Sequence, residues 1–99
     1  MRLLPHQIAA IRAVTAEVGG NEARVLLFGS RTRDDLRGGD IDLLIELPRP
    51  AGDLLALSLR VHSRLQRVLG QRKIDVLVAD PTTPQTPVLR AARRDGQLL

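Results

Sequence analysis

The chain has 99 residues, 15 basic and 11 acidic side chains, and a net charge of +4. This length fits a single domain, residues 1–99, and a hydrophobic content of 43% argues against a disordered chain. The sequence has no cysteine, no leader-like start and no apolar run near the roughly 18 residues of a membrane-spanning helix. We therefore expect a cytoplasmic protein without disulfides, a thiolate metal site or a membrane partner.

The basic and aromatic residues narrow the class of partner. Lys73 is the only lysine, and all the other positively charged residues are arginines; the chain also has two histidines. Arginine binds phosphate and carboxylate groups in a two-pronged manner, which indicates a phosphate-rich ligand or an acidic partner; solvated helix faces are the simpler alternative. Phe28 is the only aromatic residue, so rings for stacking on bases are lacking and we do not expect direct nucleic-acid binding.

The first part of the chain predicts a helix followed by a strand. Apolar residues recur at steps of three and four over residues 5–18, which indicates a helix that Gly19 and Gly20 end. Residues 24–28 are short and mostly apolar, as in a buried strand. Residues 30–37 are expected to form a short helix or a turn before the next glycine pair.

The middle of the chain predicts a second strand, residues 40–47, and a long helix that Asp53 caps and Gly70 ends. One side of this helix carries the expected core stripe, namely Leu54, Leu57, Val61, Leu65 and Val68. A second stripe lies beside it, namely Leu55, Leu59, His62 and Leu69. This second stripe either widens the core face or forms a contact surface for a partner or a second copy of the chain.

The last part of the chain predicts a third strand over residues 73–78, a turn at Asp80, a proline-rich loop and a short helix. Thr86 and Pro87 can open that helix, which should end near Asp95. Alternation of helices and strands predicts a layered α+β domain, with a small mixed sheet of about three strands packed with helices.

Two features between residues 29 and 43 indicate phosphate chemistry. Gly29 and Ser30 lie between a strand and an expected helix start, where backbone N–H groups and the helix dipole favour an anion. Asp40 and Asp42 are two residues apart in an expected strand, so both side chains should share one face. Two carboxylates this close repel each other unless a cation such as Mg²⁺ lies between them.

Asp75 is a third candidate carboxylate, on the strand face opposite Ile74 and Val76. If its strand is the neighbour of the strand that holds Asp40 and Asp42, the three carboxylates can converge as ligands of a two-metal phosphoryl-transfer site.

Each of these residues also has a simpler interpretation. Gly29 and Ser30 could form an ordinary strand-to-helix turn with a serine cap, and Asp40 could be a turn residue. Asp75 could form a salt bridge with Arg72 or Lys73. The remaining candidates are equally open: Arg31 and Arg33 either clamp phosphates or are solvated, and His6 and His62 are expected to be surface or packing residues.

Taken together, the Gly29-Ser30 pair, the Asp-x-Asp pattern at residues 40–42 and Asp75 resemble the polymerase-β-type nucleotidyltransferase superfamily. The length and the opening at residues 27–31 are most similar to its minimal members, the MNT proteins. Many MNT proteins are antitoxins paired with a helical HEPN ribonuclease toxin, and some transfer AMP from ATP to a tyrosine of that toxin.

The resemblance implies a role for each site residue. Gly29 and Ser30 would hold the triphosphate, with Arg31 and Arg33 as further nucleotide-binding candidates. Asp40, Asp42 and Asp75 would be the catalytic and metal-binding residues, with two Mg²⁺ ions expected. Asp75 would also help to activate the acceptor hydroxyl.

The same residues leave three functions open. The first is Mg²⁺-dependent transfer of AMP to a hydroxyl of a HEPN-type partner. The second is a catalytically weak MNT-like antitoxin that acts by binding alone, since Asp34 and Gly39 replace the glycine and serine of many relatives and the spacer before Asp40 is one residue shorter. The third is a small-molecule adenylyltransferase whose acceptor pocket another chain completes.

Overall fold

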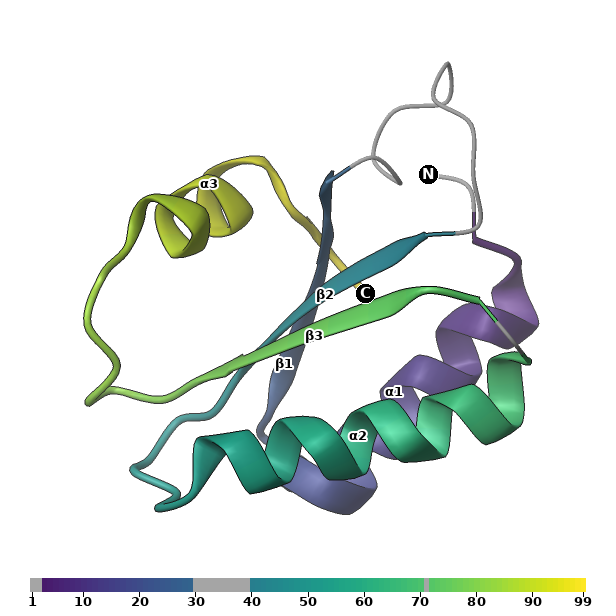
Figure 1. Ribbon diagram of the computed structural model, residues 1–99, viewed down its shortest axis with the longest axis horizontal. Coiled ribbons are helices and arrows are strands. Elements are labelled where there is room, and N and C mark those ends of the chain that lie inside the picture. The colour runs from purple at the N-terminus through teal and green to yellow at the C-terminus, as the bar shows by residue number, and fades with distance from the viewer. Residues whose placement is uncertain (1–2, 30–39, 71) are drawn as a thin grey trace.

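The computed structural model describes residues 3–29, 40–70 and 72–99. Three layers make up the fold, with two helices on one face of a sheet and one helix on the other (Figure 1). The elements in chain order are α1 (Pro5–Gly19), β1 (Arg24–Phe28), β2 (Ile41–Glu46), α2 (Leu54–Leu69), β3 (Ile74–Ala79), α3 (Pro87–Asp95) and β4 (Gln97–Leu98). The expected turn at residues 30–37 lies outside the described residues.

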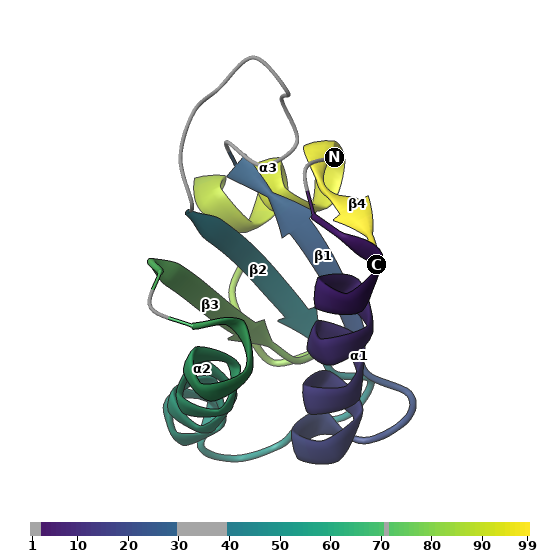
Figure 2. The ribbon, with the colours of Figure 1, turned by 90° about the vertical axis from the view of Figure 1, so that its right-hand side faces the viewer.

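The sheet is mixed, as expected, and its strands run in the order β3-β2-β1-β4 (Figure 2). The central pair β1 and β2 is antiparallel, and Phe28 stands opposite Asp42. Strands β2 and β3 are parallel, so α2 must carry the chain from one end of the sheet back to the other. The sequence predicted about three strands; the structure adds β4, which pairs antiparallel with β1 at Leu26 and Leu27.

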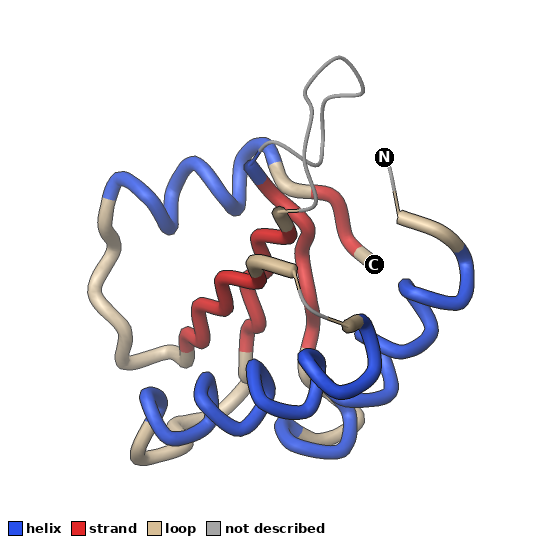
Figure 3. Tube along the Cα trace, turned by 45° about the vertical axis from the view of Figure 1, so that its right-hand side comes forward, coloured by secondary structure: helices blue, strands red, loops and turns tan. Residues whose placement is uncertain are grey.

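The two faces of the sheet carry separate cores because successive strand residues point to opposite faces. Helices α1 and α2 cover the larger core, which buries residues from all three long strands, among them Leu27, Ile41, Leu43, Ile45, Val61, Leu65 and Ile74. Helix α3 covers a smaller core of Leu26, Leu44, Ala79, Leu89 and Ala92. Figure 3 shows the strands between these two helical layers.

The expected helix ends are confirmed at α2 and α3. The Asp53 side chain accepts a hydrogen bond from the Ala56 N–H at 3.0 Å, and Gly70 ends α2 with a φ of 85°. The Thr86 hydroxyl accepts from the Leu89 N–H at 3.2 Å at the start of α3. Each cap satisfies a backbone donor that the first helical turn leaves unpaired.

The structure corrects one prediction about the face of α2 and divides the second stripe. The sequence places Val68 in the core stripe, yet it is 57% exposed. In the second stripe, Leu69 packs against the core, whereas Leu55 and Leu59 are 69% and 60% exposed. The stripe therefore widens the core face at Leu69, and only Leu55 and Leu59 are left for the contact surface that the sequence offered as the alternative.

Asp80 forms the turn that the sequence predicted and also connects two loops. Its buried carboxylate accepts hydrogen bonds from the Thr82 N–H at 2.8 Å and from the Ala51 N–H at 3.0 Å. The Thr82 hydroxyl is the largest of the contacts that lower the pKa of this carboxyl. The loop before α2 is thereby attached to the end of β3.

None of the helices in the described ranges is long and apolar enough to cross a membrane.

Candidate functional site

The parallel pairing of β2 and β3 brings two of the predicted carboxylates together. Asp42 and Asp75 are register partners, so they stand side by side on adjacent strands. Both point to the face that α3 covers further along the sheet, because Ile41 and Ile74 beside them are buried in the opposite core. Asp42 is half-buried and Asp75 is exposed. The sheet therefore brings Asp42 and Asp75 together, as predicted for neighbouring strands.

The electrostatics of Asp42 show how close its acidic neighbours are. Burial is the largest of the effects that raise its pKa, followed by a side-chain hydrogen bond with Asp75 and then by the negative charges of Asp75 and Asp40. The positive charge of Lys73 acts in the opposite direction. Lys73 is brought to this end of the sheet because its carbonyl accepts the Ile41 N–H at 2.9 Å.

Asp40 reaches the same end of the sheet in a different way from the one expected. The sequence placed it inside a strand, on one face with Asp42, but β2 begins at Ile41 and Asp40 is the exposed residue just before it. Its charge still contributes to the raised pKa of Asp42. Asp40 thus belongs to the acidic group from the position just before the strand, through the effect of its charge on Asp42.

Gly29 lies directly against the Asp42 carboxylate at the end of β1. Its φ is +74°, a conformation that side chains rarely adopt. A Cβ placed on Gly29 would stand 2.3 Å from Oδ2 of Asp42, well inside van der Waals contact. Only glycine therefore lets the chain leave β1 past this carboxylate, and this is a structural reason for the glycine in the predicted Gly29-Ser30 pair.

The acidic group borders an apolar surface on its own sheet face. Phe28 and Leu77 are partly buried against the small core beneath α3. Phe28 is the register partner of Asp42, and Leu77 follows Asp75 by two residues on the same strand. The site thus combines carboxylates at the end of the sheet with an apolar wall toward α3. Such a combination suits a ligand that has both a charged and an apolar part.

The donor chemistry of the pair fits a divalent cation. Two ionised carboxylates side by side on adjacent strands concentrate negative charge, and Mg²⁺ binds one or two carboxylates together with the phosphates of a substrate. Within the described ranges, no group of three His, Cys, Asp or Glu side chains is close enough to hold an ion by itself. The arrangement therefore fits a metal that a bound triphosphate would help to hold.

The remaining predicted site residues divide into two groups. Within the described part of the chain, Asp75 makes no salt bridge with Arg72 or Lys73, so that alternative finds no support. From the sequence, Lys73 is expected only as a possible salt-bridge partner of Asp75. The lowering effect of its positive charge on the pKa of Asp42 was not predicted. The other predicted nucleotide-binding residues, Ser30, Arg31 and Arg33, lie outside the described residues, as do Asp34 and Gly39.

Residues 9–95 match the nucleotidyltransferase domain family. The match covers most of the chain, including Gly29, Asp40, Asp42 and Asp75, and the chain belongs to this family. The fold agrees, with a mixed sheet between helical layers and the carboxylates at one end of the adjacent strands β2 and β3. No curated protein gives a significant match to this chain. Family membership makes nucleotide transfer the general activity of the domain.

We expect Gly29→Ala to destabilise the protein more than Gly52→Ala. Both glycines have a positive φ, which costs an alanine about 1–2 kcal/mol, but only Gly29 faces a carboxylate; a Cβ on Gly52 meets nothing within 4 Å. Urea denaturation of both variants measures the difference. Equal losses of unfolding free energy would show that Gly29 and Asp42 are not in tight contact.

We expect Asp42→Asn to raise the melting temperature at pH 7. A raised folded-state pKa contributes stability below the usual aspartate value of 3.8, and this contribution is lost as pH rises through the folded pKa. The wild type therefore carries an electrostatic penalty at pH 7 that the neutral asparagine removes, and the gain should disappear below pH 3.8. Asp53→Asn keeps the cap oxygen of α2 and serves as the control. A variant less stable than wild type at pH 7 would contradict this account.

Proposed function

We propose that this domain transfers AMP from ATP to a hydroxyl group of a protein acceptor in a Mg²⁺-dependent reaction. The observation that carries the proposal is the contact between Asp42 and Asp75 beside the backbone of Gly29. This arrangement supports a phosphoryl-transfer site because carboxylates can hold a metal and Gly29, with no side chain, lets the backbone come close beside them. ATP use is consistent with the cytoplasmic location that we also propose.

The carboxylates divide two tasks in this reaction. The acceptor oxygen attacks the α-phosphorus, the new oxygen–phosphorus bond forms, and the bond to pyrophosphate breaks. Asp40 and Asp42 would hold the Mg²⁺ that accompanies the triphosphate, and this metal would offset the charge of the phosphates. Asp75 is the outer, exposed carboxylate and takes the hydroxyl proton or holds a second ion. Ser30, Arg31 and Arg33 are proposed to bind the phosphates.

We propose a HEPN-type toxin as the acceptor, so that the protein acts as an antitoxin. The similarity of residues 27–31 to MNT proteins supports this partner. The exposed side chains of Leu55 and Leu59 on α2 supply a contact surface for it or for a second copy of the chain. Large exposed leucines at helical spacing favour an interface over open solvent.

Neutralisation by binding alone is the second candidate. The short spacer before Asp40 favours it, as do Asp34 and Gly39, which replace the glycine and serine of many relatives. On this alternative the α2 surface covers the partner and the carboxylates are left without a catalytic role.

The transfer reaction should separate Asp42 from Asp75. We expect Asp42→Asn to weaken Mg²⁺-ATP binding and abolish transfer, because it removes a metal ligand used in the ground state. Asp75→Asn should keep most of the nucleotide affinity and lose transfer by about 10²-fold or more, the typical effect of an interaction used in the transition state. Titration calorimetry with Mg²⁺-ATP and label transfer from ATP to the HEPN-type protein of a neighbouring gene measure the two effects.

Two results would contradict this assignment. Normal transfer by Asp75→Asn would remove Asp75 from the site. A wild-type complex that forms without any label on the partner would favour neutralisation by binding alone.

We expect Leu59→Glu to leave the fold intact and to disrupt assembly. Leu59 is 60% exposed, so the new charge stays in solvent in the isolated domain but would be buried in an interface. Arg67→Glu also places a glutamate at an exposed position of α2, two turns beyond Leu59, and should leave assembly unchanged. Circular dichroism and size-exclusion chromatography, alone and with the partner, compare the variants. Normal assembly of Leu59→Glu would exclude this surface.

A further inference from the structure

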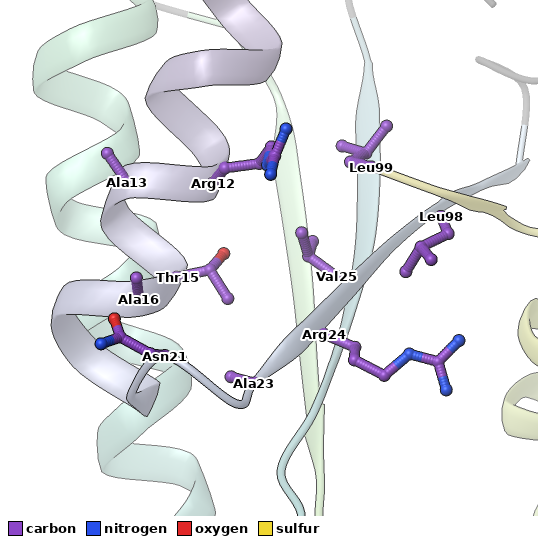
Figure 4. Close-up of a pocket in the computed structure, with 10 residues that line it drawn as sticks. All are labelled: Arg12, Ala13, Thr15, Ala16, Asn21, Ala23, Arg24, Val25, Leu98 and Leu99. Atoms are coloured by element: carbon purple, nitrogen blue, oxygen red, sulfur yellow. The ribbon is translucent and has the colours of Figure 1, made fainter.

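A hollow of about 400 Å³ lies between α1 and the sheet edge formed by β1 and β4. Its apolar floor is formed by Val25 of β1 and by Leu99, which both pack in the core under α1 and α2 (Figure 4). Leu98, at the edge of the hollow, stands opposite Leu26 and so belongs to the other sheet face, where it is 57% exposed. An apolar side chain of another molecule could therefore enter this hollow and leave water against Val25 and Leu99.

Two arginines line the same hollow from different elements. Figure 4 shows Arg12 reaching from α1 toward Leu99, and Arg24 extending from β1 on the side of Leu98. Both arginines are exposed, and neither forms an ion pair with any residue in the described ranges. Other exposed arginines, such as Arg49 with Glu22, do have an acidic partner in the fold. The hollow thus pairs an apolar floor with two cations that lack a counterion from the described chain.

The backbone beside the hollow favours an extended ligand. β4 is the last strand of the described sheet on this side. The Leu99 N–H donates to the Val25 carbonyl at 2.9 Å, so the alternation of an antiparallel ladder turns the N–H and C=O of Leu98 away from β1. A further strand could pair with these groups. The side chains of that added strand would alternate between the two faces of the sheet. One is the α1 face, where the apolar floor lies. The other is the face of Arg24, because Arg24 is next to Val25 in β1 and neighbouring strand residues point to opposite faces.

We propose that this edge binds an extended segment of a partner protein in which acidic and apolar residues alternate. The apolar side chains enter the hollow on the α1 face, and the carboxylates meet Arg24 on the other face. Arg12 lies on the α1 side of the edge, where its charge adds to the positive potential that attracts an acidic segment. Several lining residues are exposed, so the hollow is open to a chain passing along it and does not enclose a small molecule. The charge of the two arginines selects an acidic segment, and the period of two selects a strand.

This site is separate from the carboxylates. Arg24 and Phe28 are the two ends of β1, and Phe28 is the residue that faces Asp42. Four residues of strand correspond to about 13 Å. Binding at the hollow therefore neither requires the nucleotidyltransferase site nor depends on the proposed acceptor.

The test uses the full chain and a fluorescein-labelled peptide of about ten residues, the length of a long strand, in which glutamate and valine alternate. A peptide with the same residues in two blocks is the control for alternation, and a single-stranded oligothymidine of similar charge is the control for a nucleic-acid ligand. Fluorescence anisotropy gives the affinity, and amide shifts in NMR spectra locate the peptide.

We expect the alternating peptide to bind and to shift the amides of Val25 and Leu98. The double variant Arg12→Glu, Arg24→Glu should weaken binding by about tenfold or more, because like charges then oppose each other. The variant Arg60→Glu, Arg67→Glu makes the same charge change on exposed positions of α2 and should not weaken it. Circular dichroism checks that both variants fold.

Four results would overturn the proposal. They are no binding of the alternating peptide, unchanged affinity of the Arg12→Glu, Arg24→Glu variant, equal binding of the block peptide, and tighter binding of the oligothymidine at the same amides.

Discussion

The parallel pairing of β2 with β3 is the constraint on which the site depends. It places Asp42 beside Asp75, and their proximity, together with burial, raises the pKa of Asp42. Two like charges would separate if the strands were free to move. They are held by the other face of the same strands, where Ile41, Ile45 and Ile74 are buried between the sheet and α2. The apolar core thus keeps together two groups whose charges oppose their contact, a common cost of a functional site.

The two faces of the sheet differ in how completely helices cover them. The face under α1 and α2 carries the larger core, and ion pairing of Arg64 with Glu17 connects those helices at the surface. On the other face α3 covers only the part of the sheet around Leu44 and Ala79, and Arg93 attaches it to Glu46 at 2.7 Å. Glu46 is at the end of β2 remote from Asp42. Because α3 covers only that part of the face, Asp42 stays half-buried and Asp75 exposed at the carboxylate end.

Local patterns predicted most of the fold, and contacts between distant residues account for what they missed. The strand alternation and the caps at Asp53 and Thr86 act over a few residues, so they can be read along the chain. β4 has only two residues and no periodicity, and it exists because β1 offers it an edge. The exposure of Val68 depends on where α2 ends relative to the sheet. For the site, the carboxylates and the glycine were predicted, and the adjacency of Asp42 and Asp75 was predicted on the condition that their strands are neighbours. The close approach of Gly29 to Asp42 follows from the register of β1 with β2, which no local pattern specifies.

Phe28 has a consequence for how the domain can be observed. The sequence contains no tryptophan or tyrosine, and Phe28 is its only phenylalanine. The protein is therefore almost transparent in the near ultraviolet, so the absorbance and circular dichroism of a bound nucleobase can be recorded with little background. Phe28 also stands opposite Asp42 in the ladder and is only partly covered by α3. A tryptophan at this one position would be the sole fluorophore of the chain, placed beside the carboxylates.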